Sequence, residues 1–408
     1  MTATPRVTRE FDHHSAEFGQ NPLAFYRQWH QECPVVHSEK YGGYYVLTRH
    51  EDVAQAAGDP EHFSNTHDVD GTGTGAGGIG IPSLPVRFGV VEMDPPQHRS
   101  YRAMITSWLA PARVDAAEPQ IREIIVEYIE AARSKGRFDV VHDLGTPIPA
   151  CVTLELLRIP LEKWEVYAHP ICDLASYAQG DPEWPRVMQD VAAAEQDLMD
   201  LIGERRQRPA EDYITWLLRA EPEGTPLSDE EIFQAVWVVL TGGFDTTSGA
   251  IAHTMLYLSE NPQVRDELIA DRERIPGAIE EFLRYYSPAT STARTVMAPV
   301  TLGEHEFQAG DRVLLFWAAA NHDPDQFDEP DDLDISRHPN RHLAFGYGQH
   351  RCLGARLAQL EARIFLDELL ERMPEFVVLG DQAHKKPSVG AIHVYKDMPA
   401  AAEPAALA

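Results

Sequence analysis

Residues 345–354 read Phe345-Gly346-Tyr347-Gly348-Gln349-His350-Arg351-Cys352-Leu353-Gly354, which places one cysteine at the start of a predicted helix. After this stretch the apolar residues recur at helical spacing until Pro374 gives a stop signal; they are Leu357, Leu360, Ile364, Phe365, Leu369 and Met373. The first N–H groups of a helix lack carbonyl partners and carry a positive partial charge. We therefore expect Cys352 to be a stabilised thiolate that can bind a metal.

The glycines of this stretch argue against a cysteine that only packs in the core, because they let the backbone approach a flat ligand closely. The pattern Phe-x-x-Gly-x-x-x-Cys-x-Gly, carried by Phe345, Gly348, Cys352 and Gly354, resembles the heme-ligand loop of the cytochrome P-450 family. The resemblance implies that Cys352 is the axial iron ligand of heme b and that the other three residues lie against the cofactor. Oxygen activation is the first functional hypothesis.

The chain is expected to be mainly α-helical with small β-sheets and to form one domain over residues 1–408, with an N-terminal extension at 1–24 and a C-terminal tail at 396–408. Helical spacing dominates residues 95–286, for example at 121–132 and 191–206. Strands are expected at 34–47 with a turn at Gly42 and Gly43, at 313–317 and at 389–395. The resemblance implies the cytochrome P-450 fold, with a long distal helix over the heme and the cysteine loop on its proximal side.

Composition narrows the class of protein. The polar first ten residues and the lack of a long apolar run predict a cytoplasmic protein without a membrane anchor, like the soluble bacterial members of the family. A net charge of −29 argues against DNA or RNA as a partner. The four cysteines form no C-x-x-C pair, so neither a zinc site nor a disulfide framework is expected.

Residues 337–363 are an exception to this acidic composition. They hold one acid, Glu361, and five arginines, namely Arg337, Arg341, Arg351, Arg356 and Arg363. We call these five residues the arginine island. Because opposite charges steer partners together, we expect an acidic ferredoxin to dock there.

A glycine-rich stretch at 71–80 contains G-x-G-x-x-G at Gly73, Gly75 and Gly78, followed by Asp94 about twenty residues on. A dinucleotide site requires a buried strand before this motif and a helix after it. Polar residues precede it and two prolines follow, so we interpret it as a loop that closes over a pocket.

A second informative stretch lies in a long helix that is expected from the capping box at Ser228 and Glu231 to Glu260. Apolar residues on all sides of this helix indicate burial. Its middle reads Thr241-Gly242-Gly243-Phe244-Asp245-Thr246-Thr247. Each glycine there costs about 1 kcal/mol relative to alanine, and a buried Asp or Thr needs a partner. Taken alone, this would be a kinked core helix.

The same segment resembles the distal helix of the P-450 family, matched by Gly242, Gly243, Asp245, Thr246 and Thr247. The resemblance implies that the glycines open a groove for dioxygen, that the Thr246 hydroxyl donates a hydrogen bond to the activated oxygen, and that Asp245 relays protons. The substrate pocket is expected to be lined by the loop at 71–91 and by Val238, Thr241, Gly242, Thr290 and Ile392.

Heme carries two propionates that need cationic partners when they are partly buried. A helix start at Asp94-Pro95-Pro96 places His98 and Arg102 on one face. These two residues, with Arg294 and His350, match the propionate contacts of the family. Glu281 and Arg284 match its Glu-x-x-Arg motif, which Arg337 completes, and we assign these three a structural role in holding the cysteine loop. The chain departs from the family at His322, where Arg is frequent.

The predicted function is a heme-thiolate monooxygenase that inserts one oxygen atom from O₂ into an apolar small molecule, by hydroxylation or epoxidation. The resemblance implies separate electron donors, a ferredoxin and a ferredoxin reductase, and a monomeric enzyme. A peroxide-driven or ring-coupling member of the family is an alternative. An alternative of another class is a heme-based sensor or carrier without turnover. Substrate identity is not encoded in any of these motifs.

Overall fold

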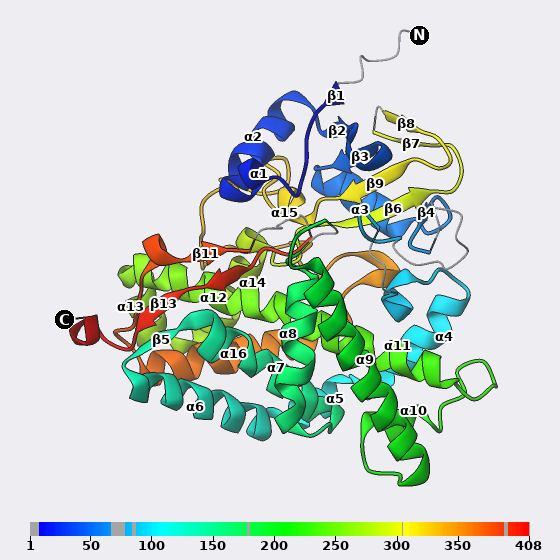
Figure 1. Ribbon diagram of the computed structural model, residues 1–408. Coiled ribbons are helices and arrows are strands. Elements are labelled where there is room, and N and C mark those ends of the chain that lie inside the picture. The colour runs from blue at the N-terminus through cyan, green and yellow to red at the C-terminus, as the bar shows by residue number, and fades with distance from the viewer. Residues whose placement is uncertain are drawn as a thin grey trace.

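Helices form most of the molecule (Figure 1). The computed structural model describes residues 8–66, 78–83, 87–177, 180–303, 305–386 and 391–407. In this part of the chain the α-helices are α1 Ala16–Gln20, α2 Pro22–Glu32, α3 His50–Gly58, α4 Gln97–Trp108, α5 Pro111–Ala116, α6 Glu118–Lys135, α7 Pro147–Leu157, α8 Trp164–Leu174, α9 Trp184–Gln207, α10 Tyr213–Leu217, α11 Asp229–Gly243, α12 Asp245–Glu260, α13 Pro262–Ala270, α14 Ile275–Tyr286, α15 Trp317–Ala320 and α16 Ala355–Arg372. None of the helices in these ranges combines the length and apolarity that a membrane crossing requires.

The strands are short, and they are β1 Thr8–Arg9, β2 Val35–Ser38, β3 Tyr44–Leu47, β4 Phe63–Ser64, β5 Arg137–Asp139, β6 Thr292–Val296, β7 Val300–Leu302, β8 His305–Phe307, β9 Arg312–Leu315, β10 Val377–Val378, β11 His384–Lys385, β12 Tyr395–Asp397 and β13 Pro399–Ala401. In the described ranges the largest sheet has the order β1-β2-β3-β9-β6-β4. The hairpin expected at 34–47 is confirmed as β2 and β3, with Val35 opposite Leu47. The strand expected at 313–317 is β9; of the one expected at 389–395, residues 387–390 lie outside the described ranges and β12 begins at Tyr395.

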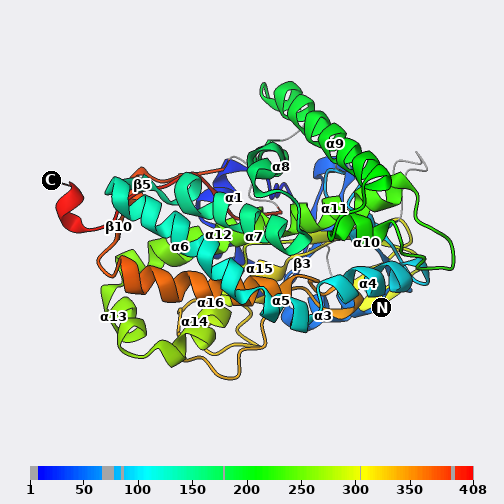
Figure 2. The ribbon, with the colours of Figure 1, turned by 90° about the horizontal axis from the view of Figure 1, so that it is seen from below.

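Most of the helices and the large sheet occupy different sides of the molecule, while α1, α2, α3 and α15 lie beside the sheet (Figure 1). One large apolar core lies among the helices, and two smaller ones lie against the sheet. Helix α16 packs against α6 and α14, and α12 crosses the middle of the helical side (Figures 1 and 2). This arrangement brings α16, which follows Cys352, beneath the central helices.

The central helix is interrupted, whereas the sequence predicts one helix from Ser228 to Glu260. Its start is as expected, because the Ser228 hydroxyl accepts from the Glu231 N–H at 3.2 Å and the Glu231 carboxylate accepts from the Ser228 N–H at 2.8 Å. Phe244, with φ −83° and ψ −72°, separates α11 from α12. The two glycines before it supply little resistance to such a break.

Both predicted chain ends are more integrated than expected. Residues 396–408, predicted to be a tail, contain β13, which pairs with β10 on one side and β5 on the other. Residues 8–24, predicted to belong to an extension, place Phe11 and Phe18 in an apolar core with Trp29. Apolar aromatic side chains release free energy on burial, so these ends fold onto the body of the protein.

Candidate active site

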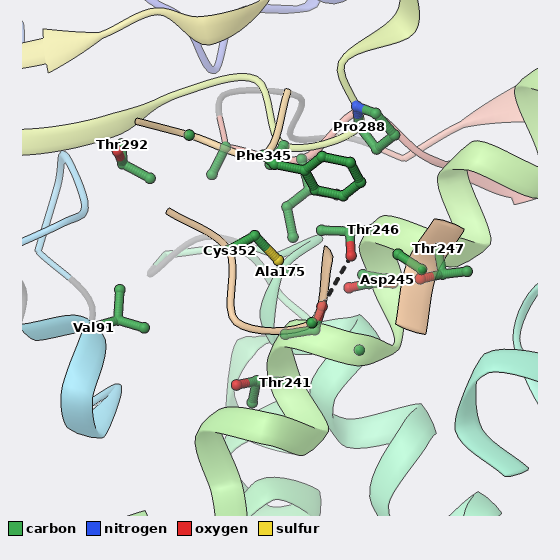
Figure 3. A pocket seen from close by; sticks show the side chains of 18 of the residues that line it. Val91, Ala175, Thr241, Asp245, Thr246, Thr247, Pro288, Thr292, Phe345 and Cys352 are labelled. Atoms are coloured by element: carbon green, nitrogen blue, oxygen red, sulfur yellow. Dashed lines mark hydrogen bonds between the residues drawn. The ribbon is translucent and has the colours of Figure 1, made fainter. Parts of the chain in front are cut away.

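A cavity of about 530 Å³ lies between the junction of α11 with α12 and the loop at 345–354 (Figure 3). Its lining comes from many elements, including α8, α11, α12, β6 and the segment before β12. Most of the lining is apolar, and Figure 3 shows Cys352 and Thr246 directed into the same space. The two stretches singled out in the sequence therefore meet at one site.

Cys352 is held in place by its own loop. Its N–H donates to the Phe345 carbonyl at 2.7 Å, and the surface that it exposes lines the cavity deep inside the molecule. Burial raises the pKa of the Cys352 thiol above its ordinary value, and the N–H groups of Gly354 and Ala355 at the start of α16 oppose this only in part. The helix-start contribution is present as predicted. This contribution alone does not stabilise the Cys352 thiolate, because the cost of desolvating the charge is larger. A bound metal cation would stabilise the thiolate.

Gly348 and Gly354 of this loop have different structural roles. Gly348 has φ 70°, and a Cβ there would lie 2.5 Å from the Ala57 carbonyl oxygen, so its role is close packing of the loop on α3. A Cβ at Gly354 would meet nothing within 4 Å. Gly354 and Phe345 line the cavity, whereas Gly348, predicted to touch the cofactor, is not among the described residues that do.

Four basic residues lie close together, and we call them the cation cluster: His98, Arg102, Arg294 and His350. Arg102, Arg294 and His350 line the cavity, whereas His98 is not among the described lining residues. The rings of His98 and His350 are 4.2 Å apart, and Arg102 donates to the Arg351 carbonyl. Burial, followed by the charge of Arg102, lowers the pKa of His98 to about 4. Burial and three neighbouring basic groups lower the pKa of His350 to about 2.

The cation cluster fits an anionic ligand. Both ring nitrogens of His98 and the Nε2 of His350 are buried and have no hydrogen-bond partner in the described structure. Burial lowers the pKa of the Arg294 guanidinium to about 10, in spite of Asp94 nearby. Buried cations and N–H groups without partners are costly. Two carboxylates on a flat cofactor beside Cys352 would satisfy them, which is the arrangement that heme b requires.

The opposite wall is the interrupted helix. The Thr246 hydroxyl donates to the Gly242 carbonyl at 2.9 Å across the break (Figure 3). A Cβ at Gly242 would meet nothing within 4 Å, because this residue faces the cavity. A Cβ at Gly243 would lie 2.5 Å from the Thr153 hydroxyl oxygen, so this glycine permits close packing on α7.

Asp245 begins α12 and is 2% exposed. Its Oδ1 lies 3.4 Å from the Nζ of Lys386, and its Oδ2 is buried without a hydrogen-bond partner in the described residues. Sequence reasoning missed Lys386, which follows β11 and is distant from Asp245 in the chain. No local pattern signals such a contact.

Four of the five residues predicted for the substrate pocket line the cavity: Val238, Thr241, Gly242 and Ile392. Thr290 is not among the described lining residues, although Ala289 and Ser291 on either side of it are. Its N–H donates to the Ala391 carbonyl at 2.9 Å, and successive side chains of an extended segment alternate in direction. Of the loop at 71–91, residues 79–83, 88, 90 and 91 line the cavity, while Gly73 and Gly75 lie outside the described residues.

The N-terminal segment also reaches the cavity, which the sequence did not suggest. His13 and His14 line it, and the Nε2 atoms of both lie 2.8 Å from the Ile81 carbonyl oxygen. The Nδ1 of His13 lies 2.8 Å from the Tyr44 hydroxyl. Burial lowers the pKa of His13 to about 3. This segment therefore fixes the wall that contains Ile81.

Glu281 is the centre of a buried network on the cysteine side. Its carboxylate oxygens accept from the guanidinium of Arg284, each at 2.8 Å, and from Arg337 Nε at 3.1 Å. It also accepts from the Asp334 N–H at 2.9 Å and the Asn340 amide at 3.0 Å. The three predicted residues are therefore in contact, and they tie α14 to the segment that leads into the cysteine loop.

His322 belongs to the same region and shows what the departure from the family pattern does. Its Nδ1 lies 3.0 Å from Asp331 Oδ1, and its Nε2 lies 2.9 Å from the Tyr285 carbonyl oxygen. The hydrogen bond with His322 is the main cause that lowers the pKa of Asp331 to about 2. His322 therefore contacts both the Asp331 carboxylate and the backbone carbonyl of Tyr285.

The arginine island is not a single exposed surface. Three of its members form ion pairs with acidic side chains. Arg337 pairs with Glu281 at 3.1 Å. Arg356 pairs with Asp115 at 2.7 Å, and Arg363 pairs with Glu118 at 2.8 Å. Arg341 and Arg351 are exposed and have no acidic partner in the described part of the chain. Folding therefore reduces the predicted charge excess, since three of its five members are neutralised.

Comparisons with known proteins agree with this site. The cytochrome P450 family model matches residues 181–387. The chain is 34% identical to cytochrome P450 130 of Mycobacterium tuberculosis, over 92% of this chain and 94% of that protein. It is 34% identical to the cyclomarin C epoxidase CymV of Salinispora arenicola, over 90% and 92% of the two chains. Cytochrome P450 CYP268A2 of Mycobacterium marinum, solved with pseudoionone, has a TM-score of 0.88 and 26% identity over 98% of this chain and 100% of that one.

Proposed function

This chain belongs to the cytochrome P450 family of heme-thiolate monooxygenases, and from that membership we propose that it inserts one oxygen atom from O₂ into an apolar small molecule, by hydroxylation or epoxidation. One observation carries the proposal: Cys352 and the Asp245–Thr246 pair line one cavity from opposite walls (Figure 3). A site that only stored heme would not need a hydroxyl and a carboxylate facing the cofactor.

Heme b is the cofactor of the family, and bound here it supplies the redox chemistry that activates dioxygen. Cys352 would hold its iron through sulfur. The cation cluster, in which three buried histidine nitrogens have no hydrogen-bond partner among the described residues, would pair with the propionates. Gly354 would leave room for the flat ring, because nothing occupies the space where its Cβ would lie.

Thr246 and Asp245 are proposed to deliver protons. The Thr246 hydroxyl donates to the Gly242 carbonyl at 2.9 Å, and rotation about its side chain would redirect that proton into the cavity. Asp245 is the nearest residue in the chain with a titratable group, and one of its oxygens has no hydrogen-bond partner in the described structure. A carboxylic acid within reach of a hydroxyl can replace the proton that the hydroxyl gives away.

The substrate is proposed to be apolar because the wall beyond Thr246 is. Val91, Leu174, Val238 and Ile392 come from four separate segments of the chain and line the cavity. Such a lining binds apolar surface and excludes water. Two similar proteins support this proposal by their names, the epoxidase of cyclomarin C and the P450 solved with pseudoionone.

Electrons are proposed to arrive from a ferredoxin and its reductase at the exposed face of the cysteine loop. Arg341 and Arg351 are exposed residues of this segment, and Tyr347, which lies between them in the sequence, is 50% exposed. An aromatic side chain with two arginines is a favourable contact for an acidic partner. Arg341→Glu combined with Arg351→Glu should slow electron transfer at low salt, and the effect should fade as ionic strength rises. Arg356→Glu is the matched control, because Asp115 already neutralises Arg356.

The test is turnover with ¹⁸O₂ in the presence of ferredoxin and reductase. A library of apolar compounds is first screened for a change in the heme absorption spectrum, and each hit is then incubated with reductant. We expect products that carry one ¹⁸O atom. Label that enters only from H₂¹⁸O₂ would favour the peroxide-driven alternative. Binding shifts without any product from any hit would favour a sensor or carrier.

A further inference from the structure

Lys386 is a largely buried cation next to Asp245, and no motif in the sequence explains it. Its Nζ lies 3.4 Å from Asp245 Oδ1, with the two side chains 11% and 3% exposed. The preceding residue, Lys385, is exposed and donates instead to the Gly19 carbonyl at 3.1 Å. Two successive lysines therefore have opposite environments, and only the second contacts the interrupted helix.

The position of the Lys386 ammonium is fixed independently of Asp245. It donates to the Cys172 carbonyl at 2.8 Å, which belongs to α8. Its backbone N–H donates to the Val394 carbonyl at 3.2 Å, within the segment that also carries the lining residues Ala391 and Ile392. The lysine is thus anchored at both its backbone and its tip.

The charged groups around it come from two helices. Asp245 belongs to α12, and Cys172 and Asp173 belong to α8; together these groups raise the pKa of the Lys386 ammonium more than burial lowers it. Burial, and then Asp245, raise the pKa of the Cys172 thiol, so that thiol stays neutral. Asp173 itself pairs with Arg186 at 2.9 Å. The buried pair therefore consists of one cation, Lys386, facing one carboxylate, Asp245.

We propose that Lys386 is a positioning residue for proton delivery: it holds Oδ1 of Asp245 and leaves Oδ2 as the oxygen that takes up a proton and passes it toward Thr246. This inference rests on the proposed function of Asp245 and Thr246. Oδ2 is suited to the task because it accepts no hydrogen bond from the described residues. Passing the proton to Thr246 returns Asp245 to the carboxylate, which then takes up the next proton from water.

The first experiment measures the contact without turnover. The holoenzyme is treated with an amine-acetylating reagent, and the modification of each lysine is followed by mass spectrometry. We expect Lys386 to react at least about tenfold more slowly than Lys385, because a buried amine reacts only through local opening. Asp245→Asn should speed the reaction of Lys386 and leave Lys385 unchanged. Equal reactivity of the two lysines in the wild type would overturn the proposal.

The second experiment measures coupling, defined as product formed per reductant consumed. Lys386→Met should lower coupling about tenfold and raise the solvent isotope effect on product formation. The loss is smaller than the roughly 10²–10⁴-fold that a positioned proton donor contributes, because the donor itself remains. Lys386→Arg should restore most of the coupling, and Lys385→Met should leave it at the wild-type value. Retention of the carbon monoxide band of the reduced heme would show that each variant is folded.

Asp245→Asn separates this inference from the proposed function. If Asp245→Asn uncouples the reaction and Lys386→Met does not, the role of Lys386 is overturned while proton delivery by Asp245 stands. If Asp245→Asn leaves coupling unchanged, proton delivery by Asp245 is itself wrong, and Lys386 loses its role with it.

Discussion

Two buried carboxylates on opposite sides of the cavity are paired in opposite ways. On the cysteine side, Glu281 accepts hydrogen bonds from two arginines, a backbone N–H and an amide, and Arg284 is fully buried with it. On the helix side, Asp245 has one ion-pair contact and one oxygen without a partner in the described residues. A carboxylate with every site occupied fixes geometry. A carboxylate with a free oxygen can exchange protons, so we call the side that Glu281 supports the holding wall and the side that carries Asp245 the reacting wall.

The largest expected effect is at the holding wall. Cys352→His should abolish the absorption at roughly 450 nm of the reduced carbon monoxide complex, the signature of a thiolate-bound heme. Cys151→Ser, at a buried cysteine away from the loop, is the control and should keep the band. A Cys352→His protein that still absorbs at this wavelength would show that another residue ligates the iron.

Thr246→Ala tests the reacting wall. It removes a hydroxyl and little volume, so heme and substrate should bind as before. Proton delivery should slow by about 10²–10⁴-fold, and reductant consumption should end in hydrogen peroxide instead of product. The measurement is product and peroxide formed per reductant consumed, with Thr246→Ser as a control that keeps the hydroxyl. Unchanged coupling in Thr246→Ala would make this residue purely structural.

Glu281→Gln tests whether the holding wall depends on complete pairing. Arg284 would be left as an uncompensated buried charge, and loss of one partner of a buried pair costs about 3–5 kcal/mol of unfolding free energy. Glu267→Gln, in the surface pair of Glu267 with Arg274 at 2.6 Å, should cost about 0–1 kcal/mol. Urea unfolding of the two variants makes the comparison. Equal losses of unfolding free energy in the two variants would mean that the Glu281 network stabilises the protein no more than a surface ion pair does.

The smallest effects come from adjacent glycines in the reacting wall. Gly243→Ala should lower the unfolding free energy by about 1–3 kcal/mol, because the added methyl meets the Thr153 hydroxyl. Gly242→Ala should raise it by about 0.5–1 kcal/mol, since alanine favours the helix and the methyl enters open space. That methyl should also weaken substrate binding, measured by spectral titration. A reversed order of stability would contradict the assignment of Gly242 to the cavity face.

Local signals in the sequence predicted the parts of the molecule that depend on neighbours in the chain. The capping box at Ser228, the hairpin at 34–47 and the helix after Cys352 each rest on a few consecutive residues. The break at Phe244 was missed because glycines permit an interruption without requiring one. The raised pKa of the Cys352 thiol was missed because burial is a property of the whole fold.

Contacts between distant segments were not predictable in the same way. Lys386 reaches Asp245, and His13 reaches Ile81, only because the fold brings remote segments together. A lysine or histidine in a polar stretch carries no mark of its partner. The pairing of Glu281 with Arg337 was an exception, since the resemblance to a known family supplied the long-range information. The single-domain organisation and the assigned site roles stay predictions.

The order in which the cavity is assembled during protein synthesis follows from the long separation in the chain between His98 and Cys352. The ribosome makes His98 first and needs roughly 10–50 s to reach residue 352. Between the synthesis of α12 and that of Cys352, the apolar face of α11 and α12 has no opposite wall, and Arg294 and His350 arrive only with β6 and the cysteine loop. Heme can therefore be enclosed only after the chain has been made as far as Cys352, and a slow supply of heme would prolong the exposure of that apolar face to chaperones and to other nascent chains.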